Sequence, residues 1–510
     1  MATHPMPPAL RAITERLNFQ VNQACKVGRF ETYKVDLSDW NLSLTDANPC
    51  IWIQAADLRA LSPPELANNL KDVVRERGWQ NHTILLFVDG ETTALRSHLP
   101  QALPTFILID AAQQARIKET ASPTAETLDI LLSQISRSQL APYETNKPVV
   151  GSQFFGRQSD INRVLQHPES NYLFIGIRRI GKTSLLKEIK RRMDRLDPTH
   201  DNQIRRLYID CTVITSVDDF LQTLTLHLDP SQLKLLMGRA AKSKRYQRMM
   251  FDRFTSLHGA PITFFIDELD RLLVQLSNQA ELFDVLRAAS TAGQARFIMA
   301  GFRRALDATT DLQSPFYNLA TSVRLGRLKR ADVKQMVLAP LDQLRVTVED
   351  REAAVDRINR ETASLPNYVQ FYCATLLDQL DERGGDTISQ QDLNSVYDNR
   401  EFRDFVLDAF MSNTEPLERV LVYALVAENK RPDSPQLFSQ RLMDETLKKL
   451  NLNLKYRQLD QACRSLEVAG IFNQVGRDFE FAVPLFQQML SETRDVHFLL
   501  EKTLEETDVV

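Results

Sequence analysis

The chain has 510 residues, which is too long for one ordinary hydrophobic core, so we expect several domains. Its composition is 43% hydrophobic and 25% charged, as in soluble globular proteins, and its net charge of -4 gives no overall basic balance of the kind that favours nucleic-acid binding. No apolar run approaches the roughly 18 residues of a membrane span. The five scattered cysteines form no C-x-x-C pair. We therefore expect free thiols and a cytoplasmic protein without a membrane partner.

The first 140 residues alternate between segments typical of strands and of helices. Expected strands lie at 51–54, 83–88 and 105–109, and expected helices at 64–77 and 124–135. This alternation predicts a small N-terminal α/β domain of unknown role, residues 1–140. The periodicity is then lost and two prolines occur, so we interpret residues 141–153 as a linker.

A phosphate-loop motif follows a short apolar strand, Tyr172–Ile175, and precedes a helical segment. The motif consists of Gly176, Ile177, Arg178, Arg179, Ile180, Gly181, Lys182 and Thr183, with Ser184 next. Backbone N–H groups in a tight glycine turn, together with the N-terminal end of a helix, hold phosphate groups. We expect Lys182 to reach the β- and γ-phosphates of a nucleotide and the Thr183 hydroxyl to bind Mg²⁺. A glycine-bounded turn that binds nothing is the alternative.

A second apolar strand ends in two acids about 85 residues later, where residues 261–266 precede Asp267 and Glu268. Acids at the carboxyl end of a parallel strand lie beside the phosphate loop in such folds. Asp267 is expected to hold Mg²⁺ through water, and Glu268 to polarise the water that attacks the γ-phosphate. The other interpretation is that both acids favour the start of the next helix. Asp270 is assigned to capping or to support of Arg271.

Three further features surround this predicted core, residues 154–341. The strand 295–300 ends before Arg303 and Arg304, either of which is a candidate to sense the γ-phosphate, because guanidinium groups pair well with phosphate. Arg178 and Arg179 are expected either to contact nucleotide or to face solvent or another domain. The remaining regions are a helical lid domain (342–412), three helices and a hairpin in the order of a winged helix (413–490), and an acidic helical tail (491–510).

These motifs resemble the AAA-like ATPases of the STAND class, relatives of the AAA+ superfamily. The resemblance covers residues 150 to 490 and adds a Phe-Gly-Arg box, which implies that Phe155, Gly156 and Arg157 lie near the nucleotide. It also implies a nucleotide contact from Pro366, although the glycine expected before that proline is absent. The fold implied is a phosphate-loop parallel-sheet core with helical and winged-helix domains. The cofactors implied are ATP or ADP and Mg²⁺.

Three functions fit the sequence. The first is a slowly hydrolysing ATPase switch that acts through protein partners or self-association. The second is a DNA-acting AAA+ ATPase, which is less favoured because the third helix of the predicted winged helix mixes Arg457 and Arg464 with acids. The third is an enzymatic N-terminal effector. Its candidate acids are Asp36, Asp39, Asp89, Glu91 and Asp110, whereas His4, His82 and His98 lack metal-ligand spacing. Weak candidates for an arginine supplied in trans are Arg287, Arg324 and Arg327.

Overall fold

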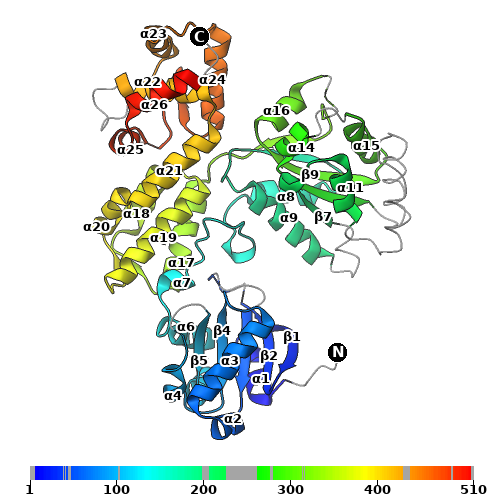
Figure 1. Cartoon of the computed structure of the whole chain (residues 1–510), viewed down its shortest axis with the longest axis vertical. Helices are drawn as coiled ribbons and strands as arrows, with labels where there is room; N and C mark the ends of the chain where they lie inside the picture. The colour runs from blue at the N-terminus through cyan, green and yellow to red at the C-terminus, as the bar shows by residue number, and fades with distance from the viewer. Residues whose placement is uncertain are drawn as a thin grey trace.

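The structure is a computed structural model of the chain. It describes residues 6–37, 40, 42–43, 48–100, 104–197, 206–225, 261–275, 280–312, 314, 316–428, 437–483 and 486–506. A helical region lies in the middle of the molecule, with an N-terminal α/β unit at one end and the C-terminal helices at the other (Figure 1). The second α/β unit lies to one side of this column. No helix in these described ranges combines the length and the apolar character needed to cross a membrane.

The N-terminal unit is a five-stranded sheet in the order β1-β2-β3-β4-β5. Its strands are β1 (Gln20–Val27), β2 (Phe30–Asp36), β3 (Asn48–Ile53), β4 (Thr83–Val88) and β5 (Thr105–Ile109). Its helices are α1 (Pro8–Arg16), α2 (Ala55–Ala60), α3 (Pro63–Arg77), α4 (Thr93–Arg96), α5 (Ala111–Glu119) and α6 (Pro123–Leu132). The hairpin β1–β2 is missing from the sequence prediction because its strands carry many polar residues and the burial of β2 does not follow a regular alternation.

The segment between the two α/β units is partly ordered by contacts with the helical region. It contains a short helix, α7 (Arg137–Leu140), and a 3₁₀ turn, η2 (Gly151–Gln153). The carboxylate of Asp381 accepts the backbone N–H groups of Arg137 at 3.3 Å and Ser138 at 2.8 Å. This stretch therefore lacks a periodic sequence pattern because contacts with other elements, rather than a regular secondary structure of its own, hold it in place.

The second unit is a sheet of parallel strand pairs in the order β10-β6-β9-β8-β7. Its strands are β6 (Tyr172–Ile175), β7 (Arg206–Asp210), β8 (Ile262–Asp267), β9 (Ala295–Gly301) and β10 (Thr321–Arg324). Its helices are α8 (Gln158–Gln166), α9 (Lys182–Leu196), α11 (Val217–Thr225), α14 (Leu269–Gln275), α15 (Ala280–Thr291) and α16 (Arg303–Thr310), with a 3₁₀ turn η3 (Cys211–Val213). The central strands β8 and β9 are buried along their whole length, as is typical of parallel sheets covered by helices. The predicted fold class is confirmed.

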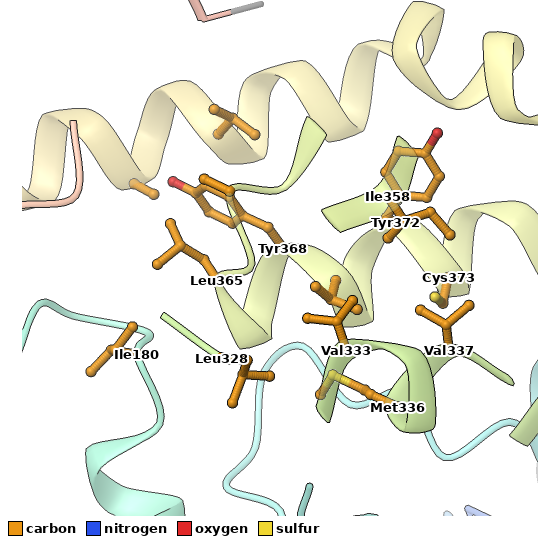
Figure 2. Close-up of a cluster of buried hydrophobic side chains, with 14 of the residues drawn as sticks. Ile180, Leu328, Val333, Met336, Val337, Ile358, Leu365, Tyr368, Tyr372 and Cys373 are labelled. Atoms are coloured by element: carbon orange, nitrogen blue, oxygen red, sulfur yellow. The ribbon is translucent and has the colours of Figure 1, made fainter. Parts of the chain in front are cut away.

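The helical region is built from five helices and one short parallel strand pair. These are α17 (Arg330–Gln343), α18 (Arg351–Glu361), α19 (Pro366–Glu382), α20 (Gln390–Asp398), α21 (Arg400–Asn413), β11 (Thr347–Val348) and β12 (Thr387–Ile388). Side chains of α17, α18 and α19 meet in a buried cluster (Figure 2). The cluster extends to Leu328 and Leu365 and includes Ile180 of the phosphate loop. The loop is thus packed against the helical region as well as against its own sheet.

The C-terminal unit contains three helices, a hairpin and two further helices. These are α22 (Pro416–Glu428), α23 (Gln440–Lys449), α24 (Tyr456–Val468), β13 (Phe472–Val475), β14 (Asp478–Phe481), α25 (Phe486–Thr493) and α26 (Val496–Glu506). The segment expected to be an acidic helical tail contains the last residues of α25 and the whole of α26. Helix α26 packs against α22. Val496 and Leu500 are buried there, so an apolar face holds this helix despite its acidic residues.

Candidate nucleotide-binding site

The phosphate loop joins the end of β6 to the start of α9, and each of its two glycines meets a different structural requirement. The Gly176 N–H donates to the Gly301 carbonyl at 3.2 Å, which ties the loop to β9. A Cβ at position 176 would lie 2.8 Å from Ile180 Cγ2, so a side chain is excluded by contact. Gly181 has a φ of +95°, a backbone conformation that residues with a side chain rarely adopt. The first glycine therefore allows close packing and the second allows the turn into α9.

Lys182 is folded back onto the loop that precedes it. Its Nζ donates to the carbonyls of Gly176 at 2.8 Å and Ile177 at 2.9 Å, and the side chain is buried. Burial lowers the pKa of Lys182, and the nearby acids Glu268 and Asp267 oppose that shift. The ammonium group is therefore held by neutral carbonyls, which phosphate oxygens would replace with stronger, charge-assisted bonds.

The two acids after β8 have different environments. Asp267 is buried, and its carboxylate accepts the Tyr208 hydroxyl at 2.7 Å and the Glu268 N–H at 3.0 Å. Glu268 is half-buried and has a φ of +53°, in the left-handed region. Non-glycine residues in that region carry a conformational cost and are concentrated at functional sites. These hydrogen bonds thus hold the Asp267 carboxylate in place, and the left-handed backbone of Glu268 ends the direction of the strand.

A cavity of about 410 Å³ lies against the loop and brings most of the predicted residues together. The predicted residues that line it are Phe155, Arg157, Arg178, Arg179, Ile180, Gly181, Lys182, Thr183, Ser184, Glu268 and Pro366. The predicted residues that do not line it are Gly156, Gly176, Ile177, Asp267 and Arg303. The cavity therefore joins the phosphate loop, the Phe-Gly-Arg box, the catalytic candidate and the start of α19.

One wall of this cavity was not predicted from the sequence. Residues 144–149, expected to be linker, line it together with Gln370 of α19. The Glu144 N–H donates to the Gln370 side chain at 2.7 Å, and the Val149 N–H donates to Ser184 Oγ at 3.1 Å. The donors in these bonds are backbone N–H groups, which almost every residue has. The sequence therefore gives no sign of this wall, and only the fold reveals it.

The Phe-Gly-Arg box is held by the segment that leads into α17. Gly156 has a φ of +73°, and a Cβ there would lie 3.0 Å from Asp332 and Leu328. The Arg157 guanidinium donates to the Gly326 carbonyl, and burial lowers the pKa of Arg157 against the opposing charges of Asp160 and Asp332. Phe155 lines the cavity half-buried, whereas Gly156 shapes the backbone behind it.

The absent glycine before Pro366 is replaced by a serine with the same kind of backbone. Ser364 has a φ of +56° and Ala363 a φ of +49°, both left-handed. The Ser364 carbonyl accepts the Leu328 N–H at 3.0 Å, and Ser364 Oγ donates to Asn359 at 2.8 Å. These bonds hold the strained backbone without a glycine, so Pro366 still starts α19 at the cavity wall.

The side chains of the two arginines after β9 lie in different environments. Asp270 accepts the backbone N–H groups of Phe302, Arg304 at 2.8 Å and Ala305 at 3.3 Å, so it caps α16 rather than the helix that contains it. The Arg304 side chain is exposed. The Arg303 guanidinium instead bonds both carboxylate oxygens of Glu418 at 2.7 Å.

The polar parts of the loop contact the end of the helical region. The Arg178 N–H donates to Asn413 Oδ1 at 2.9 Å. The Arg179 guanidinium lies 4.3 Å from the centre of the Phe405 ring, a cation–π arrangement. Arg179 therefore contacts another region of the chain and also lines the cavity, so the expected nucleotide contact stays a prediction.

The apolar parts of the loop also face away from the sheet. A Cβ placed on Gly470, in the turn after α24, would lie 3.2 Å from Ile177 Cδ1. Ile180 belongs to the buried cluster that contains Leu365 (Figure 2). All four residues between the two glycines are therefore engaged by the helical region or the C-terminal unit.

The remaining sequence candidates do not gather at this cavity. Arg287 donates to the Tyr317 carbonyl at 3.0 Å, and Arg324 is exposed on β10. Burial lowers the pKa of Arg327, against the opposing charges of Glu480 and Glu467 in the C-terminal unit, so this side chain faces an intramolecular partner. The locally basic segment 239–253 lies outside the described residues.

Two of the candidate acids of the N-terminal unit are used in local structure. Asp110 accepts the Gln113 N–H at 2.7 Å as the cap of α5, and Glu91 accepts the Thr93 hydroxyl at 3.2 Å. Asp39 and His4 lie outside the described residues. Within the described ranges, no cluster of three or more His, Cys, Asp or Glu side chains is arranged to hold a metal ion by itself.

Comparison with protein families identifies the second α/β unit. Residues 166–308 match the family model described as an AAA domain. The matched segment runs from the end of α8 into α16, so it is this unit of the chain that is similar to AAA domains. No curated protein matches the chain.

Solved structures with a similar fold cover most of the chain. The Aeropyrum pernix ORC2 protein, solved in ADPNP-ADP complexes, is 15% identical, covers 71% of this chain and 98% of its own, and has a TM-score of 0.50. The Walker-type ATPase of Pyrococcus abyssi is 13% identical, covers 69% and 99%, and has a TM-score of 0.48. The Thermotoga maritima RuvB branch migration motor is 15% identical, covers 64% and 92%, and has a TM-score of 0.36.

Proposed function

We propose that the protein binds ATP and ADP with Mg²⁺ at the cavity beside the phosphate loop and hydrolyses ATP slowly. The cavity of about 410 Å³ has the size of ordinary small-molecule sites, roughly 300–1,000 Å³. Lys182 would turn from its two carbonyl partners to the phosphates, and Glu268 would polarise the attacking water.

The residues at the site fit a magnesium nucleotide. Mg²⁺ is usually held by one or two carboxylates together with substrate phosphates, rather than by a cage of protein ligands. The buried Asp267 carboxylate and the Thr183 hydroxyl, at the start of α9, supply that set. The ion would neutralise phosphate charge during transfer, and the loop N–H groups would orient the phosphates.

We propose further that the protein is a nucleotide-controlled switch similar to the STAND class. The observation that carries this proposal is the contact of all four variable loop residues with other regions of the chain, including Arg178 with Asn413 and Arg179 with Phe405. A ligand on the loop N–H groups would compete with or reinforce these contacts, and so bias the arrangement of the domains. The arrangement of the domains would then determine binding to protein partners or self-association in the cytoplasm.

The proposed division of the chain follows the sequence prediction. It comprises an N-terminal α/β domain (1–140), a linker (141–153), the ATPase core (154–341), a helical lid (342–412), a winged helix (413–490) and a C-terminal helical segment (491–510). α17 packs against α18 and α19, so it would move with the lid.

The test of the switch is a comparison of two nucleotide states of the purified full chain. We expect bound nucleotide after purification, slow turnover, and a different small-angle scattering profile with ATPγS than with ADP. Lys182→Ala is the control and should show neither nucleotide nor a change in scattering. Identical profiles with both nucleotides, in a chain that binds both, would contradict the switch.

A DNA-acting AAA+ ATPase is the second candidate, favoured by the fold shared with the Aeropyrum pernix ORC2 protein and by the order of α22–α24 and the hairpin. Against it, the exposed Arg464 on α24 is paired with Asp460 at 2.9 Å. A duplex-stimulated ATPase rate with strong salt dependence would favour this candidate, whereas no response to duplex DNA would leave the switch.

A further inference from the structure

One short segment controls the surroundings of Arg303. We call residues 412–418, which run from the end of α21 into the first turn of α22, the elbow. Within it, both carboxylate oxygens of Glu418 accept the Arg303 guanidinium at 2.7 Å, and the Asn413 carbonyl accepts the same guanidinium at 2.8 Å. Glu415 lies 3.3 Å from it, largely exposed. Both terminal nitrogens of the Arg303 guanidinium are thus bound by the elbow.

This contact lies next to the reacting end of the proposed nucleotide. Residues 412–415 of the elbow line a second cavity, of about 360 Å³, together with Lys182, Glu268 and Arg303, whose partner Glu418 lies behind that lining. The side chain of Glu418 is only 5% exposed, and that of Arg303 is 20% exposed. A buried bidentate pair of this kind is strong, and breaking it leaves a charge that needs a new partner.

We propose that Glu418 is a specificity-determining residue that makes the site favour a nucleoside diphosphate over a triphosphate, by withholding Arg303. This inference rests on the proposed function. A γ-phosphate can gain the Arg303 contact only if Glu418 releases it, whereas a diphosphate requires no exchange. Triphosphate binding therefore bears the cost of freeing the elbow, and that same exchange would loosen the elbow from the core.

The test measures dissociation constants for ADP and ATPγS with Mg²⁺ by titration calorimetry on the full chain. Glu418→Gln keeps the side-chain shape and an acceptor for the Glu415 N–H, which Glu418 binds at 3.0 Å. It should tighten ATPγS binding by about fivefold or more and change ADP binding by less than about twofold. The matched control Glu415→Gln, an exposed acid near the same arginine, should change neither. An unchanged ATPγS/ADP ratio in Glu418→Gln would overturn the inference.

A double-mutant cycle with Arg303→Gln shows whether Glu418 acts through the arginine. If it does, Glu418→Gln changes ATPγS affinity much less in the Arg303→Gln background. An equal effect in both backgrounds would mean direct repulsion and would refute the exchange. If Glu418→Gln does not fold, the wild type decides, because a preference for ATPγS over ADP contradicts the proposal. Failure of the wild type to bind either nucleotide would instead remove the proposed function.

Discussion

Glu268 combines a costly backbone conformation with the proposed chemical role, and substitutions can separate the two. Its φ of +53° costs a residue with a Cβ about 1–2 kcal/mol. Glycine avoids that cost but gains about 0.4–1 kcal/mol of freedom in the unfolded chain. We therefore expect Glu268→Gly to be more stable than Glu268→Ala by about 0.5–1 kcal/mol, although both lack the carboxylate.

The assay follows thermal unfolding of the second α/β unit together with ATP turnover. The glycine variant should unfold about 1–4 °C above the alanine variant, as expected for a domain of this size. Glu268→Gln should keep nucleotide binding while hydrolysis falls by about 10²- to 10⁴-fold. A glycine variant less stable than the alanine variant would refute the strain argument. Wild-type turnover in Glu268→Gln would refute the role of Glu268 with water.

Three further substitutions test separate parts of the site. Lys182→Ala should abolish or severely weaken nucleotide binding in calorimetry, and unchanged affinity would contradict the phosphate contact. Tyr208→Phe removes the donor to Asp267, so the Mg²⁺ concentration for half-maximal ATPase should rise while nucleotide binding in EDTA stays the same; equal shifts in both would indicate general damage. Burial of Glu188 would raise its pKa, but hydrogen bonds from Arg191, the Gly151 N–H and Arg192 outweigh burial and lower it. Its contribution to stability is therefore present above the unfolded value of about 4.3 and lost as the pH falls further, so the stability gap to Glu188→Gln should shrink below about pH 4.

Three strands of the second α/β unit and its phosphate loop were predictable because their signals are local, whereas β7 and β10 were not predicted. β6, β8 and β9 are apolar runs with clear ends, and the glycine spacing of the loop is specific. The hairpin β1–β2 was missed because polar and apolar residues alternate only weakly along its strands, of which β1 is the edge strand of the sheet.

The composition of the site was predictable, but the orientation of its arginines was not. Arg303 and Arg304 were both candidates to sense the γ-phosphate because they follow β9, yet the partner of Arg303, Glu418, is distant in sequence. The left-handed backbone at Ser364 replaced an expected glycine, since hydrogen bonds rather than residue type hold that conformation. Long-range pairing of this kind leaves no periodic signal.

The contacts of the four loop residues with the helical and C-terminal regions have a consequence for how this sequence can vary. A Cβ on Gly470 would lie 3.2 Å from Ile177 Cδ1, so a side chain at position 470 requires the Ile177 side chain to shift. We expect homologous chains to keep the glycines, Lys182 and Thr183 while the intervening residues co-vary with their partners in the distant helices. The middle of the motif would then record the ancestry of the domain interface rather than that of nucleotide binding.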